Sequence, residues 1–152
     1  MPLLFTPGQL MAALSLSKQE WRTFRGAFPA LNADGGRVPC FTAGDILAAA
    51  VVQHVSKSLG MPLSAFSPLA APLFSVCRGH AWPQMERSHL LLAFDPSGVV
   101  LVDADQRQTP PALAITVHLK PRVQQVREML LPYGADTQQD LVFPPMIAGG
   151  RR

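Results

Sequence analysis

The chain is short of three features that would assign it to a class at once: cysteine, charged residues and long apolar runs. Its 152 residues include two cysteines, Cys40 and Cys77, too few for a disulfide framework. Only 15% of the residues are charged and 48% are hydrophobic, which excludes wholesale disorder and permits a packed core. No apolar run approaches the roughly 20 residues that span a bilayer, and the beginning, MPLLFTPGQL, lacks the basic and apolar regions of a secretory signal. We therefore expect a cytoplasmic protein with no membrane partner.

Positive charge is concentrated near the N-terminus. The formal net charge is only +3, but residues 1–80 contain six lysines and arginines against three acids, whereas residues 81–152 contain seven of each. Four of those six cations fall between positions 18 and 37. Such a concentration favours a polyanionic partner, although a merely solvated helix face would have the same composition.

Two helix starts stand close together in this cationic segment. Thr6 followed by Pro7 predicts the start of a first helix. Ser17 and Glu20 have the Ser-x-x-Glu spacing of a capping box, which predicts a second helix running to about Gly26. A short helix, a tight turn and a second helix are the order of a helix-turn-helix, in which the second helix enters a DNA groove.

The second predicted helix has an apolar side, where Trp21 and Phe24 should be buried, and a polar side. Arginine can bond bidentately to guanine and glutamine to adenine, while a lysine at a helix start suits phosphate. After this helix the turn-rich residues 34–37 (Asp-Gly-Gly-Arg) predict the tip of a wing hairpin, with Phe41 in its returning strand. The candidate DNA-binding residues are Lys18, Gln19, Arg22, Thr23, Arg25 and Arg37.

Five segments in this order resemble the DNA-binding domain of the MerR family of bacterial transcription regulators. An aromatic residue precedes a helix start in residues 5–10, and residues 16–24 resemble the recognition helix of the family. Residues 35–37 match its Gly-Arg wing, residues 41–46 its next aromatic and capped helix, and residues 59–64 the step that follows.

The resemblance covers residues 5–78 and implies a winged helix-turn-helix that binds DNA as a dimer. Members of the family dimerise through a long C-terminal helix. Here a fourth predicted helix, from 63 to 77, contains Pro68 and Pro72 and should be broken or kinked, and strands follow it. The dimer is therefore expected to form differently, through residues 88–131.

The C-terminal half has a different pattern. Residues 88–95, 99–103 and 113–119 predict three strands, the first two joined as a hairpin, and residues 121–131 predict a helix. The fold class expected is α+β, in which a winged helix-turn-helix is followed by a small antiparallel sheet with a covering helix. The domains expected are 1–80 (DNA binding), 81–135 (a β-β-β-α dimerisation or effector module) and 136–152 (a flexible tail).

Two clusters suggest chemistry, and both have a simpler interpretation. Cys77 and His80 lie close together, but a tight metal site needs three or four ligands of suitable geometry, so a buried cysteine and a surface histidine are expected. Asp95, Asp103 and Asp105 flank the predicted hairpin, where aspartates usually serve turns. We therefore expect no metal, no cofactor and no enzymatic activity.

The function expected is a sequence-specific transcriptional regulator that binds double-stranded DNA as a homodimer. The alternative is a protein-interaction adaptor on the same scaffold, such as a phage, plasmid or secretion-system accessory protein. A small-molecule effector bound by residues 81–152 is compatible with the first hypothesis.

Overall fold

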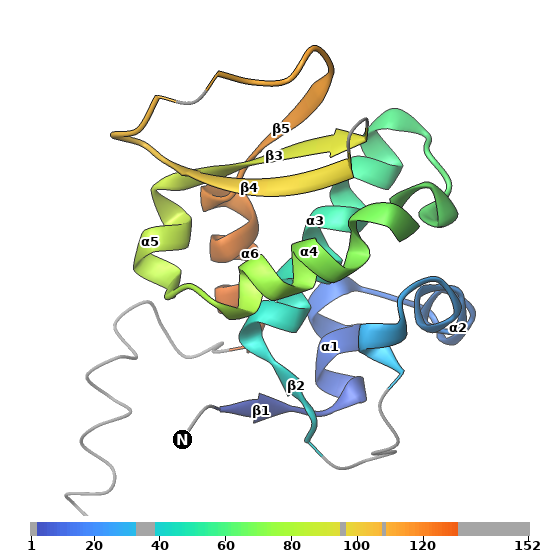
Figure 1. The fold of residues 1–152 in the computed structure, drawn as a ribbon. Helices are drawn as coiled ribbons and strands as arrows, with labels where there is room; N and C mark the ends of the chain where they lie inside the picture. Colours follow the sequence, from blue (N-terminus) through green and yellow to red (C-terminus); the bar gives the residue numbers. More distant parts are fainter. Residues whose placement is uncertain (1–2, 33–38, 95–96, 108, 131–152) are drawn as a thin grey trace, which may run out of the picture.

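The computed structural model describes residues 3–32, 39–94, 97–107 and 109–130. Their helices and strands are, in order, β1 (Leu4–Phe5), α1 (Pro7–Leu14), α2 (Lys18–Ala27), the short 3₁₀ helix η1 (Pro29–Leu31), β2 (Phe41–Thr42), α3 (Ala43–Leu59), the 3₁₀ helix η2 (Leu63–Phe66), α4 (Ser67–Arg78), α5 (Trp82–Glu86), β3 (Ser88–Phe94), β4 (Ser97–Asp103), β5 (Ala114–His118) and α6 (Lys120–Leu130). In Figure 1, α3 and α4 lie between the three-stranded sheet on one side and α1 and α2 on the other. The α+β class is confirmed at this level, as helices combined with small antiparallel sheets.

Both predicted N-terminal helices are present and begin at the predicted caps. Thr6 Oγ1 accepts the Gln9 N–H (3.1 Å), and Gln9 Oε1 accepts the Thr6 N–H (2.8 Å). Ser17 and Glu20 form the same reciprocal pair at the start of α2, at 3.1 and 3.4 Å. Each box satisfies two backbone N–H groups that a helix start leaves without intrahelical partners, which fixes where α1 and α2 begin.

The turn between α1 and α2 depends on Ser15, whose backbone is left-handed with φ 54° and ψ 44°. The Leu16 N–H donates to the Met11 carbonyl (2.8 Å), and the Ser15 N–H donates to the Ala12 carbonyl (3.2 Å). These two bonds are the Schellman closure of a helix end. Glycine is the usual residue at this position, because a Cβ costs roughly 1–2 kcal/mol in the left-handed region.

The strand that follows α2 pairs with the beginning of the chain. Phe41 was predicted in the returning strand of a wing hairpin; in the structure it belongs to β2 and pairs antiparallel with Phe5 of β1. The Cys40 N–H extends this pairing by donating to the Phe5 carbonyl at 2.9 Å. The predicted hairpin tip at 34–37, including Arg37, lies outside the described residues.

Helix α3 forms the centre of the core, with every residue from 44 to 53 buried. It begins at the Thr42–Asp45 capping box and ends at Gly60, which is left-handed with φ 65°. Asp45 also forms an ion pair with Arg78 at the end of α4. A Cβ on Gly44 would lie 2.8 Å from Arg78 Cα, so only glycine lets the two helix ends approach this closely.

The fourth predicted helix is divided, as its prolines indicated. Residues 63–66 form η2, and α4 starts at Ser67 with Pro68 in its first turn, where the missing N–H costs nothing. Pro72 is accommodated inside α4. One face of α4 is buried in the core through Leu69, Leu73 and Phe74.

The three C-terminal strands form an antiparallel sheet with the order β4-β3-β5. The β3–β4 hairpin pairs Phe94 with Ser97 and continues to Ser88 with Asp103. Both neighbours of β3 run antiparallel to it, so β4 and β5 are parallel to each other and their connection must return along the sheet. In Figure 1 the described parts of this connection, 104–107 and 109–113, lie beyond the sheet, on the side away from α4.

The covering helix of the sheet differs from the prediction. Residues 121–131 were expected to cover it, but α6 packs mainly against α1, α3 and α5, while α4 packs on β3 and β4. The reason is that Val123 and Val126 of α6 join the same hydrophobic cluster as the N-terminal helices. Met129 of the same helix is 49% exposed. One cluster therefore includes residues on both sides of the boundary expected at position 80.

Helix α5 was not predicted, because its five residues are too few for a periodic pattern. None of the helices among the described residues is long and apolar enough to cross a membrane.

The left-handed residues at the ends of α1 and α3 give a paired stability prediction. Ser15→Gly should raise the free energy of unfolding by about 1 kcal/mol, since glycine has no Cβ to strain. Gly60→Ala should lower it by a similar amount, because the same strain is introduced at φ 65°. Urea denaturation measures both. A Ser15→Gly variant less stable than wild type would show that the turn is not closed as described.

Candidate nucleic-acid interface

One side of α2 is held in the core by aromatic contacts. Trp21 and Phe24 are 9% and 4% exposed, and the Phe28 that follows the helix is fully buried. The Trp21 ring meets Phe41 edge-on, with ring centroids 5.9 Å apart, and Phe28 lies 6.1 Å from Phe74 of α4. The apolar stripe predicted from the sequence is therefore confirmed as buried.

The opposite side of α2 is exposed. We call it the polar face of α2, and it consists of Lys18, Gln19, Arg22, Thr23 and Arg25. At about 100° per residue, Gln19, Arg22 and Thr23 lie opposite the buried stripe, with Lys18 and Arg25 toward one flank. Figure 1 shows α2 at the rim of the molecule, far from the sheet and α5. Five of the six predicted DNA-binding residues thus lie together on one exposed face.

The side chains of the polar face differ in how firmly they are held. Arg25 Nη2 donates to Asn32 Oδ1 (3.2 Å), and Thr23 Oγ1 donates to the Gln19 carbonyl (3.1 Å). Among the described residues, the side chains of Lys18 and Arg22 have no hydrogen-bond or ion-pair partner. Of the two arginines on this face, Arg22 is therefore the one whose guanidinium makes no hydrogen bond or ion pair with a described residue.

The sequence interpretation missed one cation near this face. A hollow of about 180 Å³ beside α2 is lined by Glu20 and Thr23 from α2 and by Lys57 from the last turn of α3. Lys57 is more than thirty residues away along the chain, so no local pattern could have assigned it to the face. The same flank carries Glu20, whose carboxylate accepts the Ser17 N–H and adds a negative charge.

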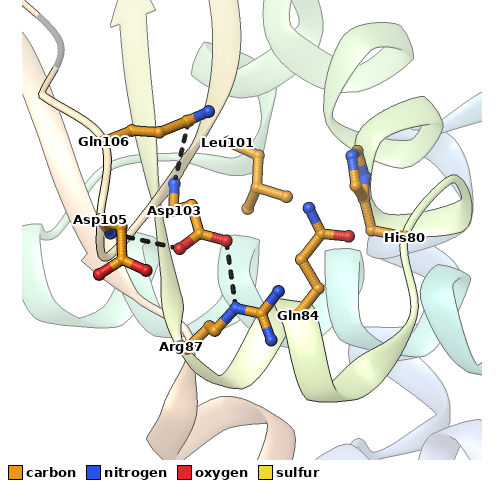
Figure 2. Close-up of a pocket in the computed structure, with 7 residues that line it drawn as sticks. All are labelled: His80, Gln84, Arg87, Leu101, Asp103, Asp105 and Gln106. Atoms are coloured by element: carbon orange, nitrogen blue, oxygen red, sulfur yellow. Dashed lines mark hydrogen bonds and ion pairs between the residues drawn. The ribbon is translucent and has the colours of Figure 1, made fainter.

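A second polar site lies on the sheet side of the molecule, remote from α2. It is a cavity of about 570 Å³, which we call the α5–β4 pocket, and Figure 2 shows the side chains that line it. Its lining comes from the connection between α4 and α5, from α5 and the residue after it, and from β4 with its following turn: His80, Gln84, Arg87, Leu101, Asp103, Asp105 and Gln106.

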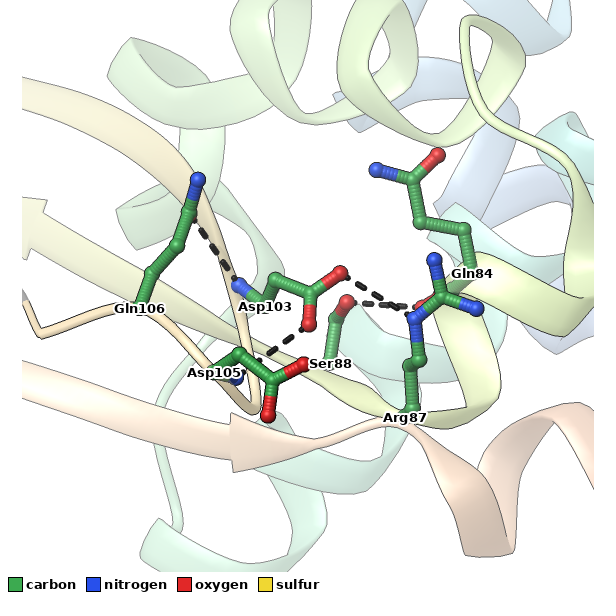
Figure 3. A network of polar contacts seen from close by, with 6 residues as sticks. All are labelled: Gln84, Arg87, Ser88, Asp103, Asp105 and Gln106. Atoms are coloured by element: carbon green, nitrogen blue, oxygen red, sulfur yellow. Dashed lines mark hydrogen bonds and ion pairs between the residues drawn. The ribbon is translucent and has the colours of Figure 1, made fainter.

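Asp103 is the centre of the hydrogen bonds in the α5–β4 pocket (Figure 3). Its Oδ1 accepts the Asp105 N–H (3.3 Å), and its Oδ2 accepts Arg87 Nε–H (3.1 Å). The Gln106 side chain accepts the Asp103 N–H at 3.4 Å. The backbone N–H of Asp105, followed by Arg87, lowers the pKa of Asp103, so its carboxylate is ionised at neutral pH.

The structure also places the aspartates and the Cys77–His80 pair that suggested chemistry in the sequence. Asp103 serves a turn and an ion pair, as strand-end aspartates usually do, and Asp95 lies outside the described residues. Cys77 is buried, and burial raises the pKa of its thiol to about 12, while His80 Nδ1 lies 2.9 Å from the Val76 carbonyl. Within the described part of the chain, no group of three or more His, Cys, Asp or Glu side chains is arranged to hold a metal.

No protein-family model, no curated protein and no solved structure matches this chain.

The Asp103 network gives a pH prediction. Because the pKa of the folded state lies below the ordinary value of an aspartate, the carboxylate stabilises the fold at neutral pH, and this contribution is lost as the pH falls through the folded pKa. We expect Asp103→Asn to have a lower Tm than wild type at pH 7 and the two values to converge in acid.

The matched control is Asp105→Asn, because this variant retains the backbone N–H of residue 105 that donates to the Asp103 carboxylate. Thermal unfolding followed by circular dichroism at several pH values measures the difference. A Tm gap between wild type and Asp103→Asn that is the same at pH 7 and pH 2 would contradict this assignment.

Proposed function

We propose that the chain is a sequence-specific DNA-binding regulator, with α2 as its recognition helix in the major groove. The observation that carries the proposal is the division of α2 into a buried aromatic side and an exposed polar side. A recognition helix needs both, because the buried side fixes its position while the other side contacts base edges. The uneven charge of the sequence supports a polyanionic partner.

The residues of the polar face take different roles in this proposal. Arg22 has no described partner and projects opposite the buried stripe, so it reads guanine through two hydrogen bonds. Gln19, on the same line of the helix, reads adenine. Lys18 at the helix start and Lys57 on the flank contact phosphates, which supply affinity and make it fall with salt. Arg25 keeps its bond to Asn32 and contacts the backbone of the duplex.

The proposal includes a homodimer and an effector site. In the described residues β4 and β5 are the two edges of the sheet, and unpaired strand edges can pair with a second copy. A dimer would place two copies of α2 on two half-sites of the duplex. The α5–β4 pocket, at about 570 Å³, has the size of a small-molecule site and is the candidate for an effector.

Substitution of Arg22 tests the recognition helix. Sites are first selected from random duplexes with the wild-type chain, and binding is then measured by fluorescence anisotropy. Arg22→Ala should weaken binding to the selected site by about 1–3 kcal/mol and relax the preference at one base pair, because the bidentate contact to guanine is lost. Arg107→Ala, an exposed arginine on the sheet side, is the matched control and should bind as wild type. Unchanged specificity in Arg22→Ala would exclude α2 as the reading helix.

A salt titration separates phosphate contacts from base contacts. Lys18→Ala should weaken binding to all duplexes alike and reduce the slope of log K against log salt by about 1. A protein-interaction adaptor would instead show little binding to random duplex even at low salt. That result would replace DNA binding by the adaptor hypothesis.

A further inference from the structure

Two histidines face each other across the sheet. His89 of β3 and His118 of β5 are direct partners in the antiparallel register. The neighbouring pair is bonded, with the Leu119 N–H donating to the Ser88 carbonyl (3.3 Å). Bonded and non-bonded pairs alternate along an antiparallel ladder, so His89 and His118 occupy a non-hydrogen-bonded position, where side chains lie closest.

The two imidazoles lie on the side of the sheet away from the main core. Residues 90 and 92 of β3 and residue 117 of β5 belong to the hydrophobic cluster, so the alternate residues 89 and 118 point the other way. His118 is exposed and His89 is half-buried. Their ring centroids are 5.6 Å apart with an interplanar angle of 55°. Among the described residues, neither ring has a hydrogen-bond or ion-pair partner.

We propose that His89 and His118 form a two-imidazole chelate for one divalent cation of the later first row, such as Zn²⁺ or Cu²⁺. Neutral imidazole is a preferred ligand of these ions. With metal–nitrogen distances of about 2.0–2.1 Å, two imidazoles on one ion have ring centres roughly 5–6 Å apart, a range that includes the observed separation of 5.6 Å. No group of three ligands exists in the described part of the chain, so water completes the coordination.

Because the two histidines come together only in the folded chain, binding of the cation can be measured as a rise in the melting temperature. His89 and His118 come from different strands and are 29 residues apart in the sequence, so the unfolded chain has no preformed chelate. A cation that binds the folded state more tightly raises the melting temperature by mass action. Because β5 is an edge strand, the bound cation would also stabilise its pairing with β3. This inference is independent of DNA binding.

The experiment uses the full chain without an affinity tag and Zn²⁺ as the probe, since Cu²⁺ oxidises thiols such as Cys40. Isothermal titration gives stoichiometry and affinity, thermal unfolding gives the shift in Tm, and NMR of the imidazole nitrogens identifies the ligands. We expect one Zn²⁺ per chain, a raised Tm, and shifts of the His89 and His118 nitrogens alone among the four histidines.

Single substitutions test the assignment. His89→Gln and His118→Gln should each reduce Zn²⁺ affinity about tenfold or more, because each removes one of the two protein ligands. Combining them should add little, because either change already destroys the chelate. His80→Gln, in the separate α5–β4 pocket, is the control and should bind as wild type. Absence of Zn²⁺ binding by wild type at millimolar concentration, or binding that survives His118→Gln unchanged, would overturn the proposal.

Discussion

Burial of one side of α2 is the constraint on which the rest of the account depends. Trp21 packs against Phe41 of β2 and Phe28 packs against Phe74 of α4, so the helix is joined to two separate parts of the core. Fully burying one aromatic side chain contributes about 1.5–3 kcal/mol, so turning α2 about its axis would cost several kcal/mol. The capping box at Ser17 fixes the start of the helix as well. With rotation and register both fixed, the polar face has a single direction, outward.

The N-terminal elements could be predicted because their signals are local. The caps at Thr6 and Ser17 and the aromatic stripe of α2 act within a few residues, and each is present in the structure. Contacts between distant segments left no such signal. The pairing of Phe41 with Phe5 and the packing of α6 against α1 and α3 depend on the folded core. For the same reason the exposed polar side of α2 was predicted, whereas the position of Lys57 beside it was not.

The hydrophobic core also connects the N-terminal and C-terminal halves of the chain, whose sequence patterns differ. Val123 and Val126 of α6 pack in the same cluster as the N-terminal helices, and the Asp45–Arg78 ion pair joins the start of α3 to the end of α4. Helix α4 in turn packs on the sheet that carries the α5–β4 pocket. The α5–β4 pocket and the polar face of α2 therefore lie on parts of the molecule that one continuous core joins.

The most direct measurement is NMR chemical-shift mapping of the ¹⁵N-labelled chain during titration with its selected duplex at low salt. The account predicts that amide shifts concentrate in residues 18–25 and in Lys57, while the indole N–H of Trp21 stays as in the unbound protein because its ring remains in the core. Shifts confined to the sheet or to α6, with α2 unaffected, would contradict it.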